Sequence, residues 1–330
     1  MEYRQLGRTG LSVSVLGFGC GAVGGLLIRG DHKDKVAAIA RAIESGVTYF
    51  DTARAYGNGA SETSLGLVLE ELSADVVVGT KVDLQPEEMV DIERSITDSV
   101  EGSLRRLRRE RVDLIQLHNV VRHARQPDRG GVSLADVEAA LAAFERLKQQ
   151  GKVGAYGING LGETEVLLQA IGLGPADTVQ SCFNLINPTA GLPVPEGFPF
   201  QDYEQLIDKA AAHQMGVIAI RVLAAGALSG LPDRAANAAP RVTPIGTAAT
   251  YAEDVALAQR FNVLVEAGFV SSLVEAAVRF AISKPEVSTA MVGISNRVQL
   301  EEAVAFANRG PLPAEALVRL SEIWAGFAKN

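Results

Sequence analysis

Short runs of apolar residues alternate along this chain with longer segments in which apolar residues recur at helical spacing. The runs are too short to be helices and are apolar at almost every position, which is typical of parallel strands buried on both faces. They predict eight strands, at 15–19, 47–50, 76–79, 112–118, 153–158, 178–183, 217–222 and 287–292. The segments between them predict helices at 34–45, 61–72, 87–109, 133–150, 163–171, 201–213, 271–282 and 296–307.

Eight alternations of strand and helix favour a closed parallel barrel, the (β/α)8 TIM barrel of the α/β class. A doubly wound open sheet is the alternative. It is disfavoured because no G-x-G-x-x-G lies between a predicted strand and helix with an acidic residue about twenty positions later. Residues 1–14 have the glycines and short alternating runs of a β-hairpin, which would close the lower end of the barrel. No change of composition marks a second domain, so we expect residues 1–330 to form a single barrel domain.

Three connections are longer than usual, at 119–132, 184–200 and 223–270. Each follows a predicted strand, so all three are expected at the C-terminal face of the barrel. Long loops at that face usually shape a ligand site.

The charge and cysteine content narrow the class of protein. A net charge of −8 disfavours nucleic acid as a partner, and we interpret the basic run at 105–111 as a solvated helix face. Two cysteines far apart in the chain do not suggest a disulfide framework. No stretch of 18 apolar residues occurs and the first residues have no apolar signal core, so we expect no membrane insertion and a cytoplasmic location.

Four ionisable residues lie at or just after the ends of predicted strands: Asp51, Tyr56, Lys81 and His118. A tyrosine hydroxyl has a pKa near 10, so rapid proton exchange at neutral pH needs a group that stabilises the phenolate. Lys81 could supply that positive charge, with Asp51 orienting Lys81 and His118 binding a carbonyl or alcohol oxygen. Such a set can move a proton to or from a substrate oxygen, and a separate group must then carry the hydride. Because no side chain carries a hydride, a nicotinamide cofactor is implied.

The segments F-D-T-A-R-A-Y-G, G-T-K-V, V-D-L-I-Q-L-H and G-K-V-G-A-Y-G-I resemble the aldo-keto reductase superfamily, including its bacterial members and its aldose or galactose dehydrogenase-like branch. The resemblance runs from L-G-R-T-G-L-S-V-S to V-G-I-S-N-R-V-Q-L-E-E, nearly the whole chain. It implies a (β/α)8 barrel and an NAD(P)-dependent oxidoreductase. Such an enzyme interconverts an aldehyde, ketone or aldose and the corresponding alcohol or hemiacetal. Tyr56 would be the acid/base, with Lys81, Asp51 and His118 as the other catalytic residues.

The resemblance also implies a cofactor site. Gln180 matches the family's carboxamide-binding glutamine, and Asn159 stands where the family usually has a serine followed by asparagine. Ile220 occupies the place of the usual stacking aromatic, so we expect the following residue, Arg221, to contact the cofactor. The full set of expected cofactor contacts is Gly19, Asp51, Asn159, Gln180, Arg221, Leu223, Gly293, Ser295, Arg297, Gln299 and Glu302.

The cofactor is expected to be NADP or NAD, with NADPH slightly favoured. Arg297 is placed to meet a 2′-phosphate. However, Gln299 stands where NADPH-preferring members are usually basic, and Ala303 replaces a usual asparagine. The expected substrate is a small carbonyl compound, sugar or polyol.

Two rival functions remain. A regulatory or sensor subunit that binds the cofactor with little turnover is favoured by the missing aromatic and disfavoured by the intact set of four. A metal-dependent barrel hydrolase needs histidine and carboxylate ligands at strand ends, and only His118 and His123 lie near each other. We therefore expect no metal. The sequence assigns no oligomeric state.

Overall fold

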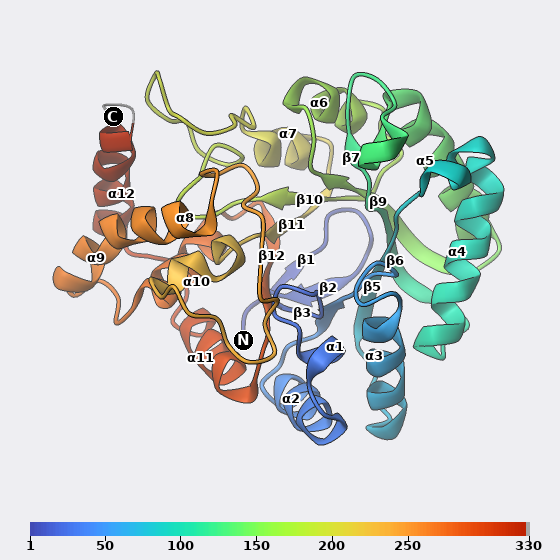
Figure 1. The fold of residues 1–330 in the computed structure, drawn as a ribbon, viewed down its shortest axis with the longest axis horizontal. Coiled ribbons are helices and arrows are strands. Elements are labelled where there is room, and N and C mark those ends of the chain that lie inside the picture. Colours follow the sequence, from blue (N-terminus) through green and yellow to red (C-terminus); the bar gives the residue numbers. More distant parts are fainter. Residues whose placement is uncertain (328–330) are drawn as a thin grey trace.

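The computed structural model describes residues 1–327, in which eight parallel strands form a closed barrel (Figure 1). Neighbouring strands follow the order β10-β11-β12-β3-β4-β5-β6-β9, so the barrel closes between β9 and β10. The strands are β3 (Leu16–Gly19), β4 (Tyr49–Asp51), β5 (Val77–Val82), β6 (Val112–Leu117), β9 (Val153–Gly160), β10 (Thr178–Cys182), β11 (Gly216–Ile220) and β12 (Val287–Gly293). The predicted (β/α)8 barrel is confirmed.

Each of the eight predicted helices has a counterpart around the barrel (Figure 1). The helix α5 (Leu134–Gln149) shows how the sequence sets such an element. Ser133 caps it, since its side chain accepts from the Asp136 N–H while the Asp136 carboxylate accepts from the Ser133 N–H. Its buried face includes Phe144 and Leu147. The eight helices are α2 (His32–Glu44), α3 (Ala60–Glu71), α4 (Ile92–Leu107), α5 (Leu134–Gln149), α6 (Thr164–Gly172), α7 (Leu206–Ala212), α10 (Leu273–Ser283) and α11 (Arg297–Ala307).

The N-terminal hairpin closes one end of the barrel. Its strands β1 (Tyr3–Gln5) and β2 (Ser12–Ser14) pair antiparallel. The buried side chains of Leu6, which follows β1, and Val13, within β2, join a cluster of residues from inside the barrel. The other buried members of this cluster are Tyr49, Leu114, Ala155, Ile218 and Met291. Gly7 has φ 54°, and a Cβ there would lie 2.1 Å from the main-chain nitrogen of Gly216, so this contact requires glycine. The predicted hairpin and its position are confirmed.

The predicted helix 87–109 is wrong in its first turns. It is divided into a 3-10 helix, η1 (Pro86–Val90), and α4. Asp91 separates them: its backbone is non-helical, with φ −135°, and its carboxylate accepts from the Arg94 N–H. An aspartate in this position caps a new helix, because it satisfies an N–H that the first turn leaves free.

The helix α7 begins five residues later than the predicted helix 201–213, which was therefore too long. The main-chain oxygen of Gln201 accepts hydrogen bonds from Asn187 Nδ2, at 2.8 Å, and Thr189 Oγ1, at 3.0 Å. Glu204 and Gln205 both have positive φ. Side chains of the 184–200 loop thus hold the segment in a non-helical form, which local sequence preference could not reveal.

The other long connections carry structure of their own. Residues 119–132 contain β7 (Val120–Val121), η2 (Pro127–Arg129) and β8 (Gly131–Val132), and β7 pairs with β8. The 223–270 connection contains η3 (Ala224–Ser229), α8 (Tyr251–Ala258), η4 (Gln259–Phe261) and α9 (Asn262–Glu266). The short helix α1 (Leu26–Arg29) follows β3.

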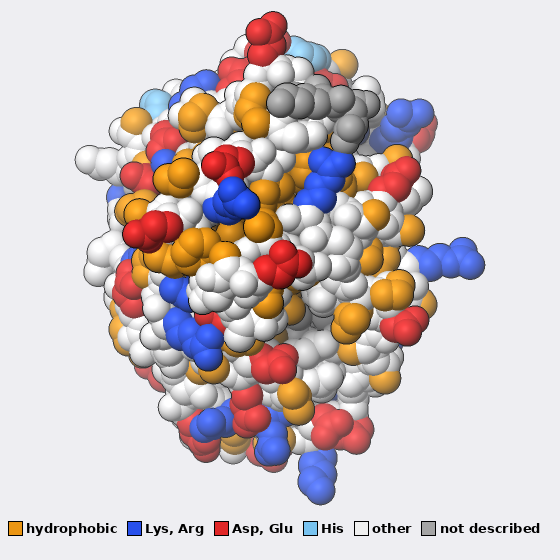
Figure 2. Space-filling view, turned by 90° about the vertical axis from the view of Figure 1, so that its left-hand side faces the viewer, with side chains coloured by type: hydrophobic (Ala, Val, Ile, Leu, Met, Phe, Trp, Pro, Cys, Tyr) orange, Lys and Arg blue, Asp and Glu red, His pale blue; other side chains and the backbone are white. Residues whose placement is uncertain are grey.

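A last helix, α12 (Ala314–Phe327), was not predicted. It packs beside the 184–200 loop, where Trp324 Nε1 donates to the main-chain oxygen of Leu185 at 2.8 Å. Figure 2 shows the face that carries α8, α9 and α12, where acidic and basic side chains are interspersed around a group of hydrophobic ones. Among residues 1–327, no helix has both the length and the apolar composition that crossing a membrane requires.

Candidate active site

A cavity of about 590 Å³ lies at the carboxyl ends of the barrel strands. We call it the main cavity. Three predicted catalytic residues line it, namely Asp51, Tyr56 and His118, whereas Lys81 is fully buried behind them. Of the expected cofactor contacts, all but Arg297 line it: Gly19, Asp51, Asn159, Gln180, Arg221, Leu223, Gly293, Ser295, Gln299 and Glu302.

The register of the barrel places Asp51 and Lys81 together. Asp51 ends β4 and pairs with Gly79 of β5, and Lys81 lies two residues further along β5, so both side chains point into the barrel. The Lys81 ammonium donates to Asp51 Oδ1 and, at 2.8 Å, to the main-chain oxygen of Thr52. Lys81 is 0% exposed and Asp51 5%. Removing either partner would therefore leave an uncompensated buried charge.

Tyr56 extends this ion pair toward the cavity. It lies in the turn after β4, and its hydroxyl oxygen is 3.2 Å from Lys81 Nζ. The rings of Tyr56 and His118 meet edge to face, with their centroids 5.6 Å apart and an interplanar angle of 83°. The structure thus brings all four predicted catalytic residues into one cluster.

Burial changes the protonation behaviour of Tyr56. It raises the pKa of the hydroxyl above its ordinary value, while the Lys81 ammonium acts in the opposite direction. Sequence analysis expected Lys81 to decide this pKa, and in the structure desolvation outweighs it. For Lys81 itself, burial would lower the pKa of the ammonium, but Asp51 and Tyr56 raise it above its ordinary value. At neutral pH the pair is therefore a neutral phenol beside an ammonium.

His118 faces the same cavity from the position directly after β6. Lys81 pairs with Gln116, and His118 lies two residues beyond Gln116, toward the same inward face. Desolvation and the nearby Lys81 lower the pKa of His118 to about 3. Its imidazole is thus neutral at physiological pH. It can donate a hydrogen bond to a substrate oxygen without giving up a proton.

The low pKa of His118 predicts a contribution to the pH dependence of folding. The unfolded state takes up a proton below pH 6.5, whereas the folded state does so only near pH 3. This contribution to the free energy of unfolding is therefore fully present above pH 6.5 and is lost as the pH falls toward 3. We expect His118→Asn to lose less unfolding free energy than the wild type between about pH 7 and pH 4.5 in urea titrations.

The exposed His213 provides the control, since His213→Asn should follow the wild-type pH dependence. Parallel curves for the wild type and His118→Asn would contradict the prediction.

Two further side chains hold Asp51. Its Oδ2 accepts from the Tyr49 hydroxyl at 3.1 Å and from Gln180 Nε2 at 2.8 Å. Gln180, expected at the cofactor carboxamide, therefore also orients the carboxylate. Sequence analysis missed Tyr49. Its signal was a tyrosine two residues before Asp51 on the same strand. Gly79 leaves room for this side chain, since a Cβ at Gly79 would lie 2.4 Å from the Tyr49 hydroxyl oxygen.

The cavity wall near His118 suits a nicotinamide. Asn159 Nδ2 donates to the main-chain oxygen of His118 at 2.9 Å, while Asn159 Oδ1 is buried with no hydrogen-bond partner among residues 1–327. A buried acceptor without a partner favours a ligand that brings an N–H donor, such as a carboxamide. The residues present at this end therefore fit the cofactor that the fold implies.

The start of α11 forms the opposite end of the main cavity. A helix N-terminus favours anions, but both donors of Ser295 are already used. Its hydroxyl donates to the Gly24 oxygen at 2.7 Å and its N–H to Gln299 Oε1 at 3.1 Å. A phosphate accepting from that N–H would have to replace Gln299. Arg297 does not line the cavity: its side chain is 62% exposed and its Nε lies 3.7 Å from Glu301.

The segment after β11 is held in a strained backbone conformation beside the cavity. Arg221, Ala224 and Ala225 have φ of 56°, 45° and 58°, values that side chains other than glycine rarely adopt. Asn184 Nδ2 donates to the Arg221 main-chain oxygen at 3.1 Å, and the Arg221 guanidinium donates to the Thr243 oxygen at 3.1 Å. Strain of this kind persists only where neighbours hold it, and it is common at functional sites.

This geometry defines the class of protein. It is a (β/α)8 barrel with a tyrosine, a buried lysine–aspartate pair and a histidine around one cavity at its C-terminal face. The model of the Aldo/keto reductase family matches residues 15–325, and the chain belongs to this family of oxidoreductases.

Several known proteins are similar over nearly their whole length. "Uncharacterized oxidoreductase YqkF" of Bacillus subtilis is 26% identical over 97% of this chain and 95% of its own. "L-galactose dehydrogenase" of Arabidopsis thaliana is 28% identical over 92% of this chain and 88% of its own. The solved holo form of aldo-keto reductase AKR11C1 from Bacillus halodurans has a TM-score of 0.70 at 24% identity, covering 98% of this chain and 96% of that one. This last similarity confirms the fold.

Proposed function

We propose that this protein catalyses NAD(P)-dependent interconversion of a carbonyl compound and the corresponding alcohol or hemiacetal, with Tyr56 as the general acid/base. The observation that carries the proposal is the position of the Tyr56 hydroxyl. It lies 3.2 Å from the ammonium of the buried Lys81–Asp51 pair, beside a neutral His118, and Tyr56 lines the main cavity.

Each residue has a role that follows from its protonation state. When bound, the nicotinamide cofactor supplies the hydride in reduction and accepts it in oxidation. In reduction, Tyr56 gives its proton to the carbonyl oxygen, and the phenolate left behind is stabilised by the Lys81 ammonium. His118 donates a hydrogen bond to the same substrate oxygen. In oxidation the phenolate takes the proton of the alcohol, so the same four residues serve both directions.

The function is tested by mixing the protein with NADPH or NADH and a reactive aldehyde, and with NADP or NAD and an aldose, while following absorbance of the reduced nicotinamide. Turnover in either direction is expected. Tight cofactor binding without turnover of any aldehyde or aldose would favour the regulatory subunit instead. The rival hydrolase would need a group of metal ligands, and within residues 1–327 no three His, Cys, Asp or Glu side chains are grouped to hold a metal ion.

The choice between NADP and NAD is proposed to depend on the start of α11, where Gln299 and Glu302 line the main cavity and Arg297 does not. The dissociation constants of both cofactors, measured by fluorescence titration, decide it.

Arg221 is proposed as a cofactor contact. Loss of a hydrogen bond from a charged donor typically costs about 1.5–3 kcal/mol, so Arg221→Ala should weaken cofactor binding by roughly 10- to 150-fold. Arg241→Ala is the matched control, since Arg241 is exposed on the same connection and does not line the cavity. An unchanged dissociation constant in Arg221→Ala would remove Arg221 from the site.

A further inference from the structure

The phenol of Tyr49 is buried inside the barrel beside the catalytic residues. Tyr49 is 0% exposed and belongs to the apolar cluster that includes Leu114 and Met291. Among residues 1–327 its hydroxyl makes one hydrogen bond, which it donates to Asp51 Oδ2 at 3.1 Å. Burial and the Asp51 carboxylate raise the pKa of Tyr49 well above its ordinary value. The phenol therefore stays neutral and remains a donor.

The neighbouring strand β5 has a glycine where it faces this phenol. The three atoms nearest to a Cβ placed at Gly79 all belong to Tyr49, namely the hydroxyl oxygen at 2.4 Å, Cζ at 3.1 Å and Cε2 at 3.3 Å. Gly79 does not have a positive φ, so the glycine provides space and not an unusual backbone conformation. A glycine within a strand weakens it, because it has no side chain to pack. The space at Gly79 thus serves the Tyr49 hydroxyl.

The two oxygens of the Asp51 carboxylate have different kinds of partner. Oδ1 accepts from the Lys81 ammonium. Oδ2 accepts from two neutral donors, the Tyr49 hydroxyl and, at 2.8 Å, Gln180 Nε2. Gln180 lines the main cavity, whereas Tyr49 does not. Asp51 is therefore the link through which Tyr49 can act on the reaction.

The negative charge of Asp51 opposes the ionisation of Tyr56. Asp51 raises the pKa of the Tyr56 hydroxyl, whereas the Lys81 ammonium lowers it. The hydrogen bond to Oδ2 places the positive end of the Tyr49 O–H dipole against the carboxylate. It offsets part of the negative charge, so more of the attraction of Lys81 remains for a phenolate at Tyr56.

The other groups around Tyr56 leave Asp51 as the source of the opposing charge. The titratable and charged groups near Tyr56 are Asp51 of β4, Lys81 of β5, His118 after β6, Arg221 after β11 and Cys20 after β3. His118 and Cys20 are neutral at physiological pH, since burial lowers the pKa of His118 to about 3 and raises the pKa of the Cys20 thiol. Lys81 and Arg221 both lower the pKa of Tyr56. A change in the hydrogen bonds of Asp51 should therefore be measurable at Tyr56.

We propose that Tyr49 is a positioning residue of the reaction, whose hydroxyl holds Asp51 and thereby makes Tyr56 a stronger acid. This rests on the proposed function, in which Tyr56 is the general acid/base. Loss of the Tyr49 hydroxyl should then make Tyr56 a weaker acid. In reduction a weaker acid gives up its proton less readily, and in oxidation less phenolate is present to accept one. Both directions should slow by the same factor, because the variant cannot change the equilibrium of the reaction.

The test compares Tyr49→Phe with the wild type by two measurements. NMR of protein labelled at tyrosine Cζ, with Tyr56→Phe to assign the signal, gives the pKa of Tyr56 without any turnover. The pH dependence of kcat/KM in both directions gives its pKa during the reaction. We expect Tyr49→Phe to raise both pKa values by about 0.5–1 pH unit and to lower kcat/KM at neutral pH by about 2- to 10-fold in each direction. The cofactor dissociation constant should not change, and Tyr3→Phe should match the wild type in every measurement.

Gly79→Ala provides a second variant, one that keeps the tyrosine. Its Cβ would displace the Tyr49 hydroxyl, so it should raise the pKa of Tyr56 as Tyr49→Phe does and add little to it in the double variant. An unchanged or lowered pKa of Tyr56 in Tyr49→Phe would overturn the proposal, even if turnover fell, and so would full additivity of the two changes. If no carbonyl or alcohol were turned over with either cofactor, the proposed function would fail, whereas the NMR titration would still decide whether Tyr49 acts on Tyr56.

Discussion

Tyr56→Phe is expected to bind the cofactor as the wild type does and to lose turnover by roughly a hundred- to ten-thousand-fold. The change removes one oxygen atom, and that oxygen is the proposed source of the transferred proton. It lies 3.2 Å from Lys81 Nζ, and the substitution keeps the aromatic ring in place. Fluorescence titration gives the cofactor dissociation constant, and steady-state rates in both directions give kcat and kcat/KM.

A matched control is available in the hairpin. Tyr3→Phe also removes a hydroxyl, one that donates to the Gly46 oxygen at 3.1 Å on an exposed surface, and should leave turnover at the wild-type level. If Tyr56→Phe turned over at near-normal rates, Tyr56 could not be the acid/base. A loss of cofactor binding equal to the loss of turnover would assign Tyr56 to binding instead.

Lys81→Met is expected to destabilise the protein by about 3–5 kcal/mol, because it leaves the Asp51 carboxylate buried without a compensating positive charge. Turnover should also fall by at least about a hundredfold, since the ammonium beside the Tyr56 phenolate is gone. The ion pair has side-chain exposures of 0% for Lys81 and 7% for Asp51. Urea unfolding at neutral pH measures the first effect and steady-state kinetics the second.

The exposed pair on α4 supplies the comparison. Arg94 and Asp98 have side-chain exposures of 80% and 69%, so Arg94→Met should cost only about 0–1 kcal/mol. Combining Lys81→Met with Asp51→Leu should restore part of the stability and none of the turnover, since the unpaired charge is gone but the catalytic cluster is too. Similar stabilities for Lys81→Met and Arg94→Met would contradict the role assigned to the buried pair.

The elements of the barrel were readable from the sequence because a strand buried on both faces must be apolar along its length. Val112, Leu114, Ile115 and Leu117 show this in β6, and all four are buried. Helix ends were predicted less accurately. The hydrogen bonds from Asn187 and Thr189 to the Gln201 oxygen keep that segment non-helical, so α7 begins later than predicted. The single-domain interpretation of residues 1–330 stays a prediction.

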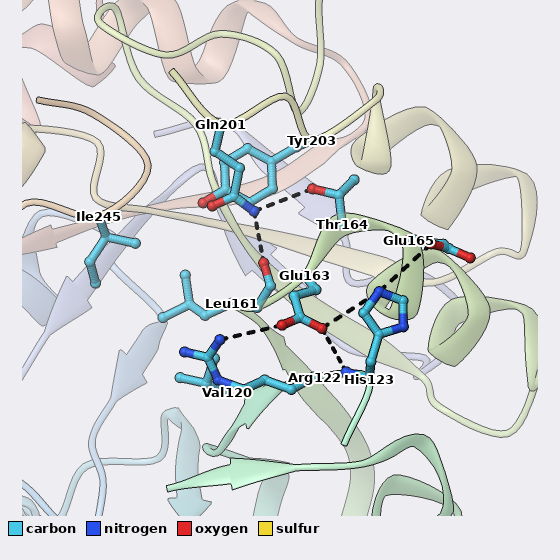
Figure 3. A pocket seen from close by; sticks show the side chains of 11 residues that line it. Val120, Arg122, His123, Leu161, Glu163, Thr164, Glu165, Gln201, Tyr203 and Ile245 are labelled. Carbon is cyan, nitrogen blue, oxygen red and sulfur yellow. Dashed lines mark hydrogen bonds and ion pairs between the residues drawn. The ribbon is translucent and has the colours of Figure 1, made fainter. Parts of the chain in front are cut away.

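The rotation of α11 about its axis decided which of the expected cofactor contacts at its start line the main cavity. Arg297, Gln299 and Glu302 are close in sequence, but Gln299 and Glu302 line the main cavity whereas Arg297 is exposed. A motif gives the order of these side chains but not the face of α11 on which each one lies. A second pocket, which Arg122 and Gln201 line (Figure 3), is a stronger case, because loops that follow four different strands must meet to form it.

The sequence by itself determined the alternation of strands and helices, and with it the barrel and the end of the barrel at which Asp51 and His118 lie. Local apolar periodicity is enough for that. Only the tertiary structure decided that Tyr49 and Gln180, the latter 129 residues away, both hold Asp51, and that burial outweighs Lys81 in setting the pKa of Tyr56. Strand register and desolvation depend on every neighbour that packs around a group, and those neighbours are distant in the chain.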